Sequence, residues 1–329
     1  MSYEEISKVH KKLGKLIEES FELRRTIARE FAIQKGIPLR DIASGNVDDK
    51  TMIEFNRYIS NALGEERTKS IPKDVDIERF KIGHIPVEWI SIPGASQGKV
   101  YYNLFVGGYI MGTLESRRWI PYHISRVTHL RSLNIEYRLA PEYPFPAALE
   151  DSIDSYKWLI AKGFDPKKII IGGESAGGGL AIATLLKLKE LKLSLPAAGV
   201  LMSPWADLTG SGESIIRNQR FEPLIKDGLI NMAKSYAQKE SLTNPLISPV
   251  FANLKGLPPL LIQAGGIEAL IDDSISLAER AKKDGVEVKL EVYENMTHVF
   301  QNFGEELSES RKAFESINDF IKKFVASSK

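Results

Sequence analysis

A serine flanked by glycines follows a short apolar run near the middle of the chain. Residues 172–179 read Gly-Gly-Glu-Ser-Ala-Gly-Gly-Gly and come directly after the apolar run 168–171. A strand that stops at Gly-x-Ser-x-Gly and turns into a helix is typical of a nucleophile elbow. Gly173 and Gly177 suit a turn that is too tight for side chains beside the serine. We therefore expect Ser175 to be a nucleophile, which requires a histidine, an acid and an oxyanion hole elsewhere in the chain.

Short apolar strands alternate with helices from about residue 84 onwards. The expected strands are 87–92, 100–105, 132–137, 168–171, 198–202, 259–264 and 286–293. The expected helices are 116–130, 146–162, 176–192, 272–284 and 305–326. This alternation predicts the α/β class, with a mostly parallel sheet that helices cover on both faces.

Two segments fall outside this alternation. Apolar residues at helical spacing predict one amphipathic helix over 4–33, and a short helix is expected around 50–63. Between Asp207 and Asn244 the alternation breaks, and this insertion has helical spacing at Ile225, Leu229, Met232 and Tyr236. An insertion where core strands end is well placed to cover a site. Periodicity alone does not decide whether the N-terminal helix packs on a core or forms a lid.

Composition excludes several classes of function. The 44 Lys+Arg residues balance 43 Asp+Glu, so no charge excess indicates a nucleic-acid partner or an anionic membrane. The chain has no cysteine, hence no disulfide, thiol nucleophile or Cys-ligated metal. No His, Asp and Glu residues have metal-ligand spacing, so we expect no metal. Without a signal pattern or an apolar run of ~18 residues, we expect a cytoplasmic protein with no membrane span.

A histidine and a diglycine lie where the elbow requires them. His298 follows the last expected strand, C-terminal to the serine, and is the expected general base. The loop after the strand 100–105 contains Gly107 and Gly108. Their N–H groups and that of Ala176 are the expected oxyanion hole, although a diglycine is also common in simple turns.

Further segments carry a resemblance to a known family. Residues 137–148 read Tyr-Arg-Leu-Ala-Pro-Glu-Tyr-Pro-Phe-Pro-Ala-Ala, the elbow reads Gly-Glu-Ser-Ala-Gly-Gly, Ser-Pro-Trp stands at 203–205 before Asp207, and 296–300 reads Met-Thr-His-Val-Phe. From about residue 84 to 325 the chain resembles the hormone-sensitive-lipase-like branch of the α/β-hydrolases, the bacterial and archaeal carboxylesterases. The resemblance implies an eight-stranded core over 51–207 and 244–329. It also implies a helical cap made of 1–50 and the insertion 208–243, and cofactor-free esterases for short and medium acyl chains.

The chain departs from this family at two places. The family's His-Gly-Gly-Gly reads Phe105-Val106-Gly107-Gly108 here, which keeps the two glycines that donate to the oxyanion. After the seventh strand, the position of the family's triad aspartate is Ile267, which cannot orient an imidazole.

The neighbouring Glu268 is the expected replacement for that aspartate, since Gly265-Gly266 permits a small backbone shift toward His298. The alternative is that Glu268 faces solvent. Asp272 and Asp273 are expected to cap the following helix, and Asp207 is a more distant candidate for the acid.

Aromatic and apolar residues near the catalytic loops are candidates for an acyl pocket. They are Tyr109, Trp205, Phe221 and Leu224, each of which could equally belong to the core. Glu174, inside the elbow, is expected to support the loop by hydrogen bonds.

These features favour a serine carboxylesterase that takes a small-molecule ester through an acyl-enzyme, with Ile267 in place of the usual aspartate. The alternative is a catalytically impaired hydrolase-fold protein that binds a small ligand under its cap. A third is an enzyme altered at its active site, in which Ile267→Asp would restore activity. The resemblance also suggests homodimer pairing through the edge strand 286–293.

Overall fold

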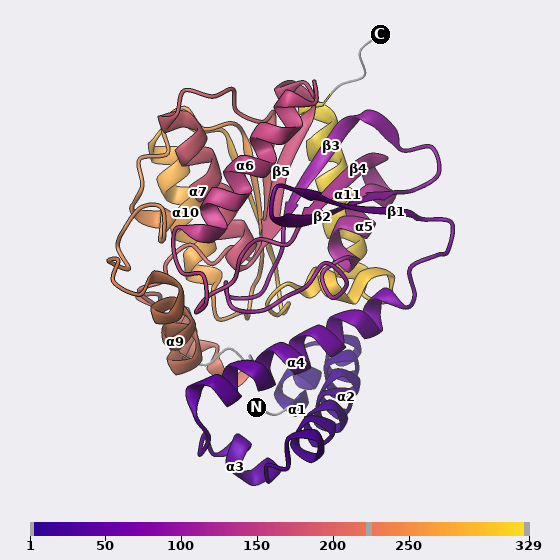
Figure 1. The fold of residues 1–329 in the computed structure, drawn as a ribbon, viewed down its shortest axis with the longest axis vertical. Helices are drawn as coiled ribbons and strands as arrows, with labels where there is room; N and C mark the ends of the chain where they lie inside the picture. Colours follow the sequence, from indigo (N-terminus) through magenta and orange to yellow (C-terminus); the bar gives the residue numbers. More distant parts are fainter. Residues whose placement is uncertain (1–2, 222–225, 326–329) are drawn as a thin grey trace.

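An eight-stranded sheet forms the centre of the computed structural model, which describes residues 3–221 and 226–325 (Figure 1). The strand order is β1-β2-β4-β3-β5-β6-β7-β8. The strands are β1 (Asp76–Ile82), β2 (Ile85–Ser91), β3 (Ser96–Leu104), β4 (Leu130–Ile135), β5 (Ile169–Glu174), β6 (Ala198–Met202), β7 (Leu260–Gly265) and β8 (Val288–Tyr293). The pairs β1–β2 and β2–β4 are antiparallel and all others are parallel, which confirms the predicted α/β class.

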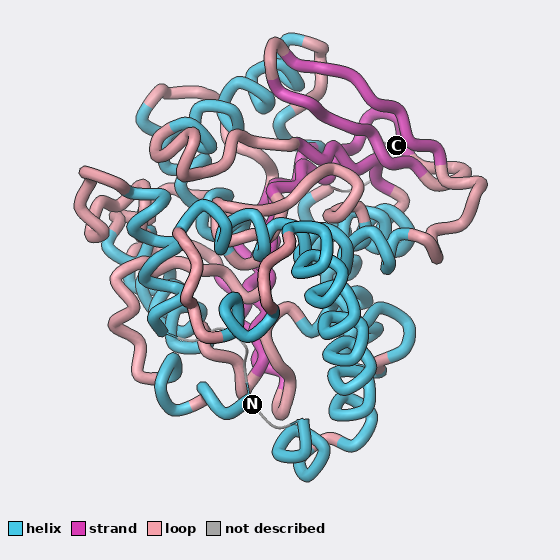
Figure 2. Tube along the Cα trace, turned by 60° about the horizontal axis from the view of Figure 1, so that its bottom comes forward, coloured by secondary structure: helices cyan, strands magenta, loops and turns pink. Residues whose placement is uncertain are grey.

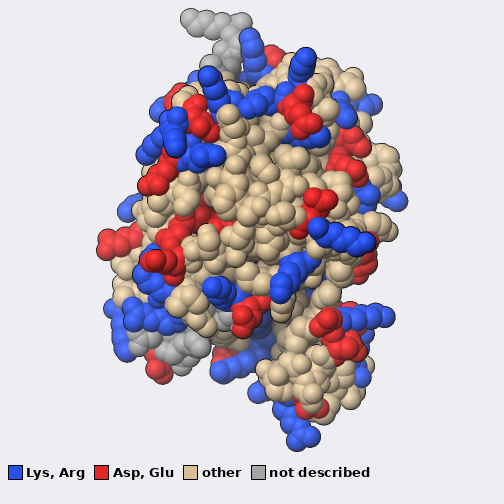
Figure 3. Space-filling view, turned by 90° about the vertical axis from the view of Figure 1, so that its left-hand side faces the viewer, with Lys and Arg blue, Asp and Glu red and all other residues tan. Residues whose placement is uncertain are grey.

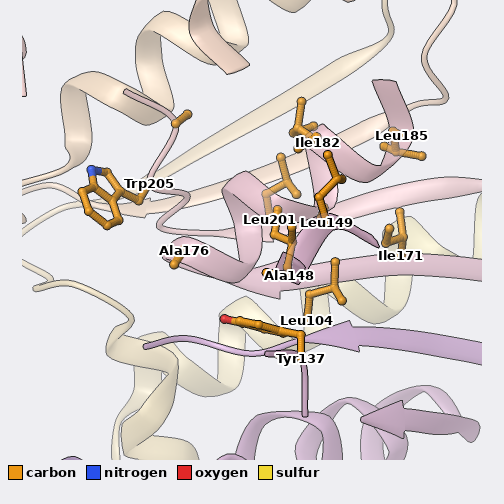
Figure 4. Packing of buried hydrophobic residues seen from close by; sticks show 14 of the residues in the cluster. Leu104, Tyr137, Ala148, Leu149, Ile171, Ala176, Ile182, Leu185, Leu201 and Trp205 are labelled. Atoms are coloured by element: carbon orange, nitrogen blue, oxygen red, sulfur yellow. The ribbon is translucent and has the colours of Figure 1, made fainter. Parts of the chain in front are cut away.

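Helices cover both faces of the sheet. They are α5 (Trp119–Thr128), α6 (Ala147–Ala161), α7 (Ala176–Glu190), α10 (Ile271–Lys283) and α11 (Ser308–Phe324). Because strand side chains alternate between faces, Ile171 and Leu201 pack with α6 and α7, as Figure 4 shows. Their neighbours Ile170 and Val200 pack with α5 and α11 on the other face. The buried strands therefore read as continuous apolar runs, which is why the sequence revealed them.

The first strand was not expected from the sequence. β1 forms an antiparallel hairpin with β2, and its side chains are mostly exposed or half-buried. An edge strand rich in charged residues carries no apolar pattern, so its segment reads as polar and mixed.

Four helices precede the sheet and lie together at one end of the molecule (Figures 1 and 2). They are α1 (Tyr3–Val9), α2 (Lys11–Lys35), α3 (Leu39–Ala43) and α4 (Asp49–Thr68). The single helix expected over 4–33 is interrupted at His10, whose ring accepts a hydrogen bond from the Leu13 N–H at 3.0 Å and so caps α2. Ile27 of α2 packs against Ile59 of α4, so this helical unit continues past residue 50. The boundary at residue 50 stays a prediction.

The insertion after β6 contributes α8 (Ser214–Arg217) and α9 (Lys226–Ala237), with α9 at the same end of the molecule as α1–α4 (Figure 1). Leu229, Met232 and Tyr236 lie in α9 as expected, whereas Ile225 is outside the described residues. Charges of both signs are interspersed over the face that Figure 3 shows. Among the helices of 3–221 and 226–325, none is long and apolar enough to cross a membrane.

Candidate active site

The strand β5 ends at a sharp turn that carries Ser175. This residue has φ 53° and ψ −120°, in the left-handed region that non-glycine residues rarely adopt, and α7 begins at the next residue. The Ser175 N–H donates to the Met202 carbonyl at 2.9 Å. A Cβ on Gly177 would lie 1.9 Å from the Leu104 carbonyl oxygen, and one on Gly173 would lie 2.3 Å from it. Both flanking positions therefore require glycine, and the backbone has the geometry of a nucleophile elbow.

The loop after β3 runs beside this turn, because Leu104 at the end of β3 pairs with Gly173 of β5. A Cβ on Gly107 would lie 1.8 Å from the Met111 carbonyl oxygen, and one on Gly108 would lie 2.5 Å from Met232 Sδ of α9. Within the described chain, the N–H groups of Gly107, Gly108 and Ala176 donate to no protein acceptor. Three amide donors left over near one serine can stabilise an oxyanion.

Glu174 joins the two segments. Its Oε2 accepts a hydrogen bond from the Val106 N–H at 3.0 Å, so the last residue of β5 fixes the start of the glycine loop. Glu174 is 1% exposed, and burial raises the pKa of its carboxyl to about 8, against the lowering effects of Val106 and Arg117. The hydrogen-bonding support expected of Glu174 is present, from a group that is mostly protonated at neutral pH.

His298 and Glu268 come together from the loops after β8 and β7. His298 Nδ1 lies 3.9 Å from Glu268 Oε2, which is within ion-pair range and longer than a hydrogen bond. Glu268 is 0% exposed, which contradicts the alternative that it faces solvent. Among the described residues its Oε1 has no hydrogen-bond partner, so that oxygen is available to the imidazole after a small rotation.

Ser203, just after β6, holds the Glu268 carboxylate in place. Its hydroxyl donates to Glu268 Oε2 at 2.6 Å and accepts from the Val299 N–H at 3.1 Å. The Gly265 N–H donates to the same carboxylate oxygen at 2.9 Å. Ser203 thus links the carboxylate to the backbone beside His298. The sequence analysis missed this role, because Ser203 entered it only as part of a motif.

Ile267 packs toward the cap. It contacts an apolar cluster that includes Leu13 and Leu16 of α2, and also Phe221 and Met296. Its N–H donates to the Met296 carbonyl at 3.1 Å. The Ile267 side chain therefore belongs to the contact between the N-terminal helices and the core.

The other carboxylates near this site accept hydrogen bonds from groups other than His298. Asp273 Oδ2 accepts from the N–H groups of Ala206 and Asp207, at 2.9 and 2.8 Å, and Asp272 Oδ2 accepts from the Ser214 N–H at 2.8 Å. The expectation that Asp272 and Asp273 cap α10 is therefore wrong, since both hold the loop between β6 and α8. Asp207 itself accepts from Thr209 and Ser211 within that loop.

A cavity of about 300 Å³ opens beside His298, between the core and the N-terminal helices. Its walls are Ile17, Ser20, Phe21, Arg24, Ser60, Leu63, Arg67, Phe221, Thr297, His298, Val299, Asn302 and Phe303. Of the four expected pocket residues, Phe221 lines this cavity and Leu224 is outside the described residues. Tyr109 and Trp205 lie in the main core instead, and Tyr109 stacks on Tyr236 with a centroid distance of 3.8 Å.

The sequence analysis missed most of this lining. Ile17 and Phe21 appeared there only as part of a helical pattern, and Arg24 and Arg67 carried no signal. Helical periodicity identifies an apolar stripe without saying what the stripe faces. Within the described part of the chain, no three His, Cys, Asp or Glu side chains are grouped so as to hold a metal ion.

The eight-stranded sheet, the turn at Ser175 between β5 and α7, and the position of His298 after β8 are those of the α/β-hydrolase fold. A family model described as alpha/beta hydrolase fold matches residues 103–302. The chain is 35% identical over 285 residues to an acetyl-hydrolase of Streptomyces hygroscopicus, covering 83% of this chain and 94% of that protein. It is 33% identical over 228 residues to an esterase of Acinetobacter venetianus, covering 69% and 75%.

Solved structures indicate the family within the α/β-hydrolases. The crystal structure of an esterase from the bacterial hormone-sensitive lipase family is similar, with a TM-score of 0.81 and 38% identity, over 94% of this chain and 99% of that one. An esterase/lipase from an uncultured bacterium gives a TM-score of 0.80 at 35% identity, with the same coverage of 94% and 99%. The chain belongs to the hormone-sensitive lipase family of α/β-hydrolases, as its sequence indicated.

Proposed function

We propose that this protein is a serine carboxylesterase whose triad is Ser175, His298 and Glu268. The observation that carries the proposal is the buried Glu268 carboxylate, 3.9 Å from His298 Nδ1 and held by Ser203. The relatives described above as an acetyl-hydrolase and an esterase support the same reaction class.

The proposed reaction gives each of these groups a role. His298 takes the proton of the Ser175 hydroxyl as the serine oxygen attacks the ester carbonyl. The N–H groups of Gly107, Gly108 and Ala176 donate to the oxygen that becomes negative. Collapse of this intermediate expels the alcohol, which receives the proton from His298, and leaves the acyl group on Ser175.

Deacylation repeats these steps with water. His298 removes a proton from the water, and the resulting hydroxide attacks the acyl-enzyme and releases the carboxylic acid. Glu268 orients the imidazole and stabilises its protonated form in both halves of the reaction. The cavity beside His298 has apolar walls from Ile17, Phe21 and Phe303 and a small volume, which suits short to medium acyl chains.

Hydrolysis of p-nitrophenyl butyrate by wild type and single variants tests this proposal. Ser175→Ala should reduce the rate to background, and Glu268→Gln should lower kcat by about 10²–10⁴, the range up to the effect of a lost triad acid. Glu294→Gln, at an exposed glutamate on the histidine loop, is the matched control and should keep the wild-type rate. A Glu268→Gln enzyme as active as the control would remove Glu268 from the triad.

Ile267→Asp separates the remaining alternatives. Because Ile267 packs against the apolar cluster of the N-terminal helices, an aspartate there should lower stability and leave kcat no higher than that of wild type. A large gain in kcat would mean that Ile267 marks a lost acid. A wild-type rate equal to that of Ser175→Ala would favour the ligand-binding alternative, in which the gap between His298 and Glu268 reflects a disabled triad.

Two further assignments stay proposals. Homodimer pairing through β8 would use an exposed edge of the sheet, where Val292 is 46% exposed, and light scattering in solution tests it. The cytoplasmic location expected from the sequence is a question for fractionation of the source cells.

A further inference from the structure

Two arginines line the cavity beside His298. Arg24 comes from α2 and Arg67 from α4, so each of the two helices contributes one guanidinium to the same cavity of about 300 Å³. Among the described residues 3–221 and 226–325, the cavity lining contains no aspartate or glutamate. Its remaining polar groups are neutral, from Ser20, Ser60, Thr297 and Asn302, apart from the imidazole itself.

Neither arginine is neutralised within the described chain. No carboxylate of residues 3–221 or 226–325 lies within 4.0 Å of the guanidinium nitrogens of Arg24 or Arg67. Both side chains are half-buried, and burial lowers the pKa of each guanidinium. Holding an unpaired charge away from water costs free energy, which an anion bound between the two arginines would offset.

A third arginine adds to the positive field. Arg117 donates to the hydroxyl of Ser60, which itself lines the cavity. Burial, and then the charge of Arg67, lower the pKa of Arg117 to about 10, so the two guanidinium groups lie close enough to repel one another. Such repulsion is relieved by a negative group in the cavity.

Carboxylates line a hollow that adjoins the cavity. An adjoining hollow shares Ser20, Leu63, Arg67 and other residues with the cavity and is also lined by Glu19, Glu66 and Glu306. Glu66 is already paired with Lys69. These three glutamates line the adjoining hollow, and none of them lines the cavity next to His298.

We propose that the preferred substrates are esters that carry a carboxylate at the end remote from the reacting carbonyl, and that Arg24 and Arg67 bind this carboxylate. The inference rests on the proposed esterase function and deepens it. Guanidinium groups bind carboxylates by charge-assisted hydrogen bonds, in fork geometry where space allows. Dicarboxylic acid monoesters place the charge in the acyl half, and acetate esters of hydroxy acids place it in the alcohol half.

The test compares substrates of equal shape and different charge. Monomethyl adipate carries a carboxylate, and methyl adipamate carries a neutral primary amide in its place. Wild type should show a kcat/KM ratio of carboxylate to amide of about tenfold or more, the size expected of a hydrogen bond to a charged group. The ratio should fall toward unity in Arg24→Met and Arg67→Met. Acetoxyhexanoate and its amide repeat the comparison with the charge in the alcohol half.

Matched controls remove the same charge from nearby exposed positions. Arg25, next to Arg24 on α2, pairs with Glu22 and is 65% exposed, and Lys69 follows Arg67 and is 71% exposed. Arg25→Met and Lys69→Met should keep the wild-type ratio. A ratio near unity in wild type with both substrate pairs, or equal losses on carboxylate and amide in the arginine variants, would overturn the inference.

A measurement on wild type alone covers the case in which an arginine variant does not fold. Adipate should inhibit p-nitrophenyl butyrate hydrolysis more strongly than adipamide does, and added salt should reduce the difference. Equal inhibition by both compounds would overturn the inference. If wild type hydrolyses p-nitrophenyl butyrate but does not distinguish the carboxylate substrates from their amides, this inference alone is wrong. If wild type hydrolyses no ester, the proposed function is wrong as well.

Discussion

Ser203 is the residue on which the arrangement of acid and histidine depends most directly. Its hydroxyl is shared between the Glu268 carboxylate and the Val299 N–H. Ser203→Ala should leave both groups short of one buried hydrogen bond, which costs about 1–3 kcal/mol in the free energy of unfolding. We also expect kcat for p-nitrophenyl butyrate to fall by about tenfold, as a poorly held carboxylate orients His298 less well.

Steady-state kinetics and urea unfolding of Ser203→Ala measure these two effects. Ser211→Ala removes a hydroxyl that donates to Asp207 within its own loop, and it serves as the control. A kcat unchanged from wild type in Ser203→Ala would show that Glu268 keeps its position without this serine.

At this scale the sequence predicts some residues well and others poorly. Ser175 and its glycines are identifiable because the tight turn excludes side chains, a constraint that leaves a local pattern. Glu268 was expected only because it is next to Ile267, at the position where the family's aspartate was expected. Its burial depends on the fold and is not visible in the sequence. Ser203 has no local signature, since its partners Glu268 and Val299 lie on distant segments. Arg24 has none either, since the cavity that it lines is formed by distant segments.

Among the elements, α4 is tied to the core by Arg57. Its guanidinium donates to the carbonyls of Ile110 and Ala140, at 2.7 and 3.0 Å, and to the Glu142 carboxylate at 2.6 Å. Ile110 in turn donates its N–H to the Gly107 carbonyl. The N-terminal helices and the glycine loop are therefore joined through one side chain.

Arg57→Met should loosen this connection. We expect a loss of about 1–3 kcal/mol in the free energy of unfolding, since two half-buried carbonyls lose a charged donor. We also expect a several-fold lower kcat/KM for p-nitrophenyl butyrate. Arg40→Met removes an 86% exposed arginine of the same helical unit and should change neither quantity. Identical behaviour of the two variants would contradict a bracing role for Arg57.

Element boundaries were predictable where apolar patterns are strong. β6 was expected over 198–202 and spans those residues, because both of its faces are buried. The break at His10 and the strand β1 were missed. The first depends on one capping contact, and the second is an edge strand whose side chains are mostly exposed or half-buried.

For the whole molecule, the buried Glu174 makes stability depend on pH. The pKa of its carboxyl is about 8 in the folded protein, against an ordinary value of 4.5. Between these values the folded state keeps a proton that the unfolded state has released, so the free energy of unfolding falls as pH rises, by about 1.4 kcal/mol per pH unit. This contribution is fully present below pH 4.5 and is lost as pH rises through 8.

Glu174→Gln removes the titrating group and keeps an acceptor for the Val106 N–H. Its free energy of unfolding relative to wild type should therefore rise between pH 5 and pH 8.5, by about 2–5 kcal/mol. Urea unfolding of both proteins at several pH values measures this difference. Parallel curves for the two proteins would show that Glu174 does not titrate in this range.

The overall architecture followed from the alternation of strands and helices, while the cavity did not. Its walls come from α2, α4, the insertion and the histidine loop, which are far apart in the chain. Which face of α2 meets which loop depends on how the helical unit packs, and an amphipathic pattern leaves that choice open.

The order of the strands also bears on how activity arises as the chain is synthesised. Strands β5 to β8 are neighbours in the sheet in the same order as in the sequence. The nucleophile turn can thus form early, followed by Ser203 and then by the acid loop. His298 follows β8, so under the proposed mechanism Ser175 of a nascent chain lacks its general base until all eight strands have been synthesised.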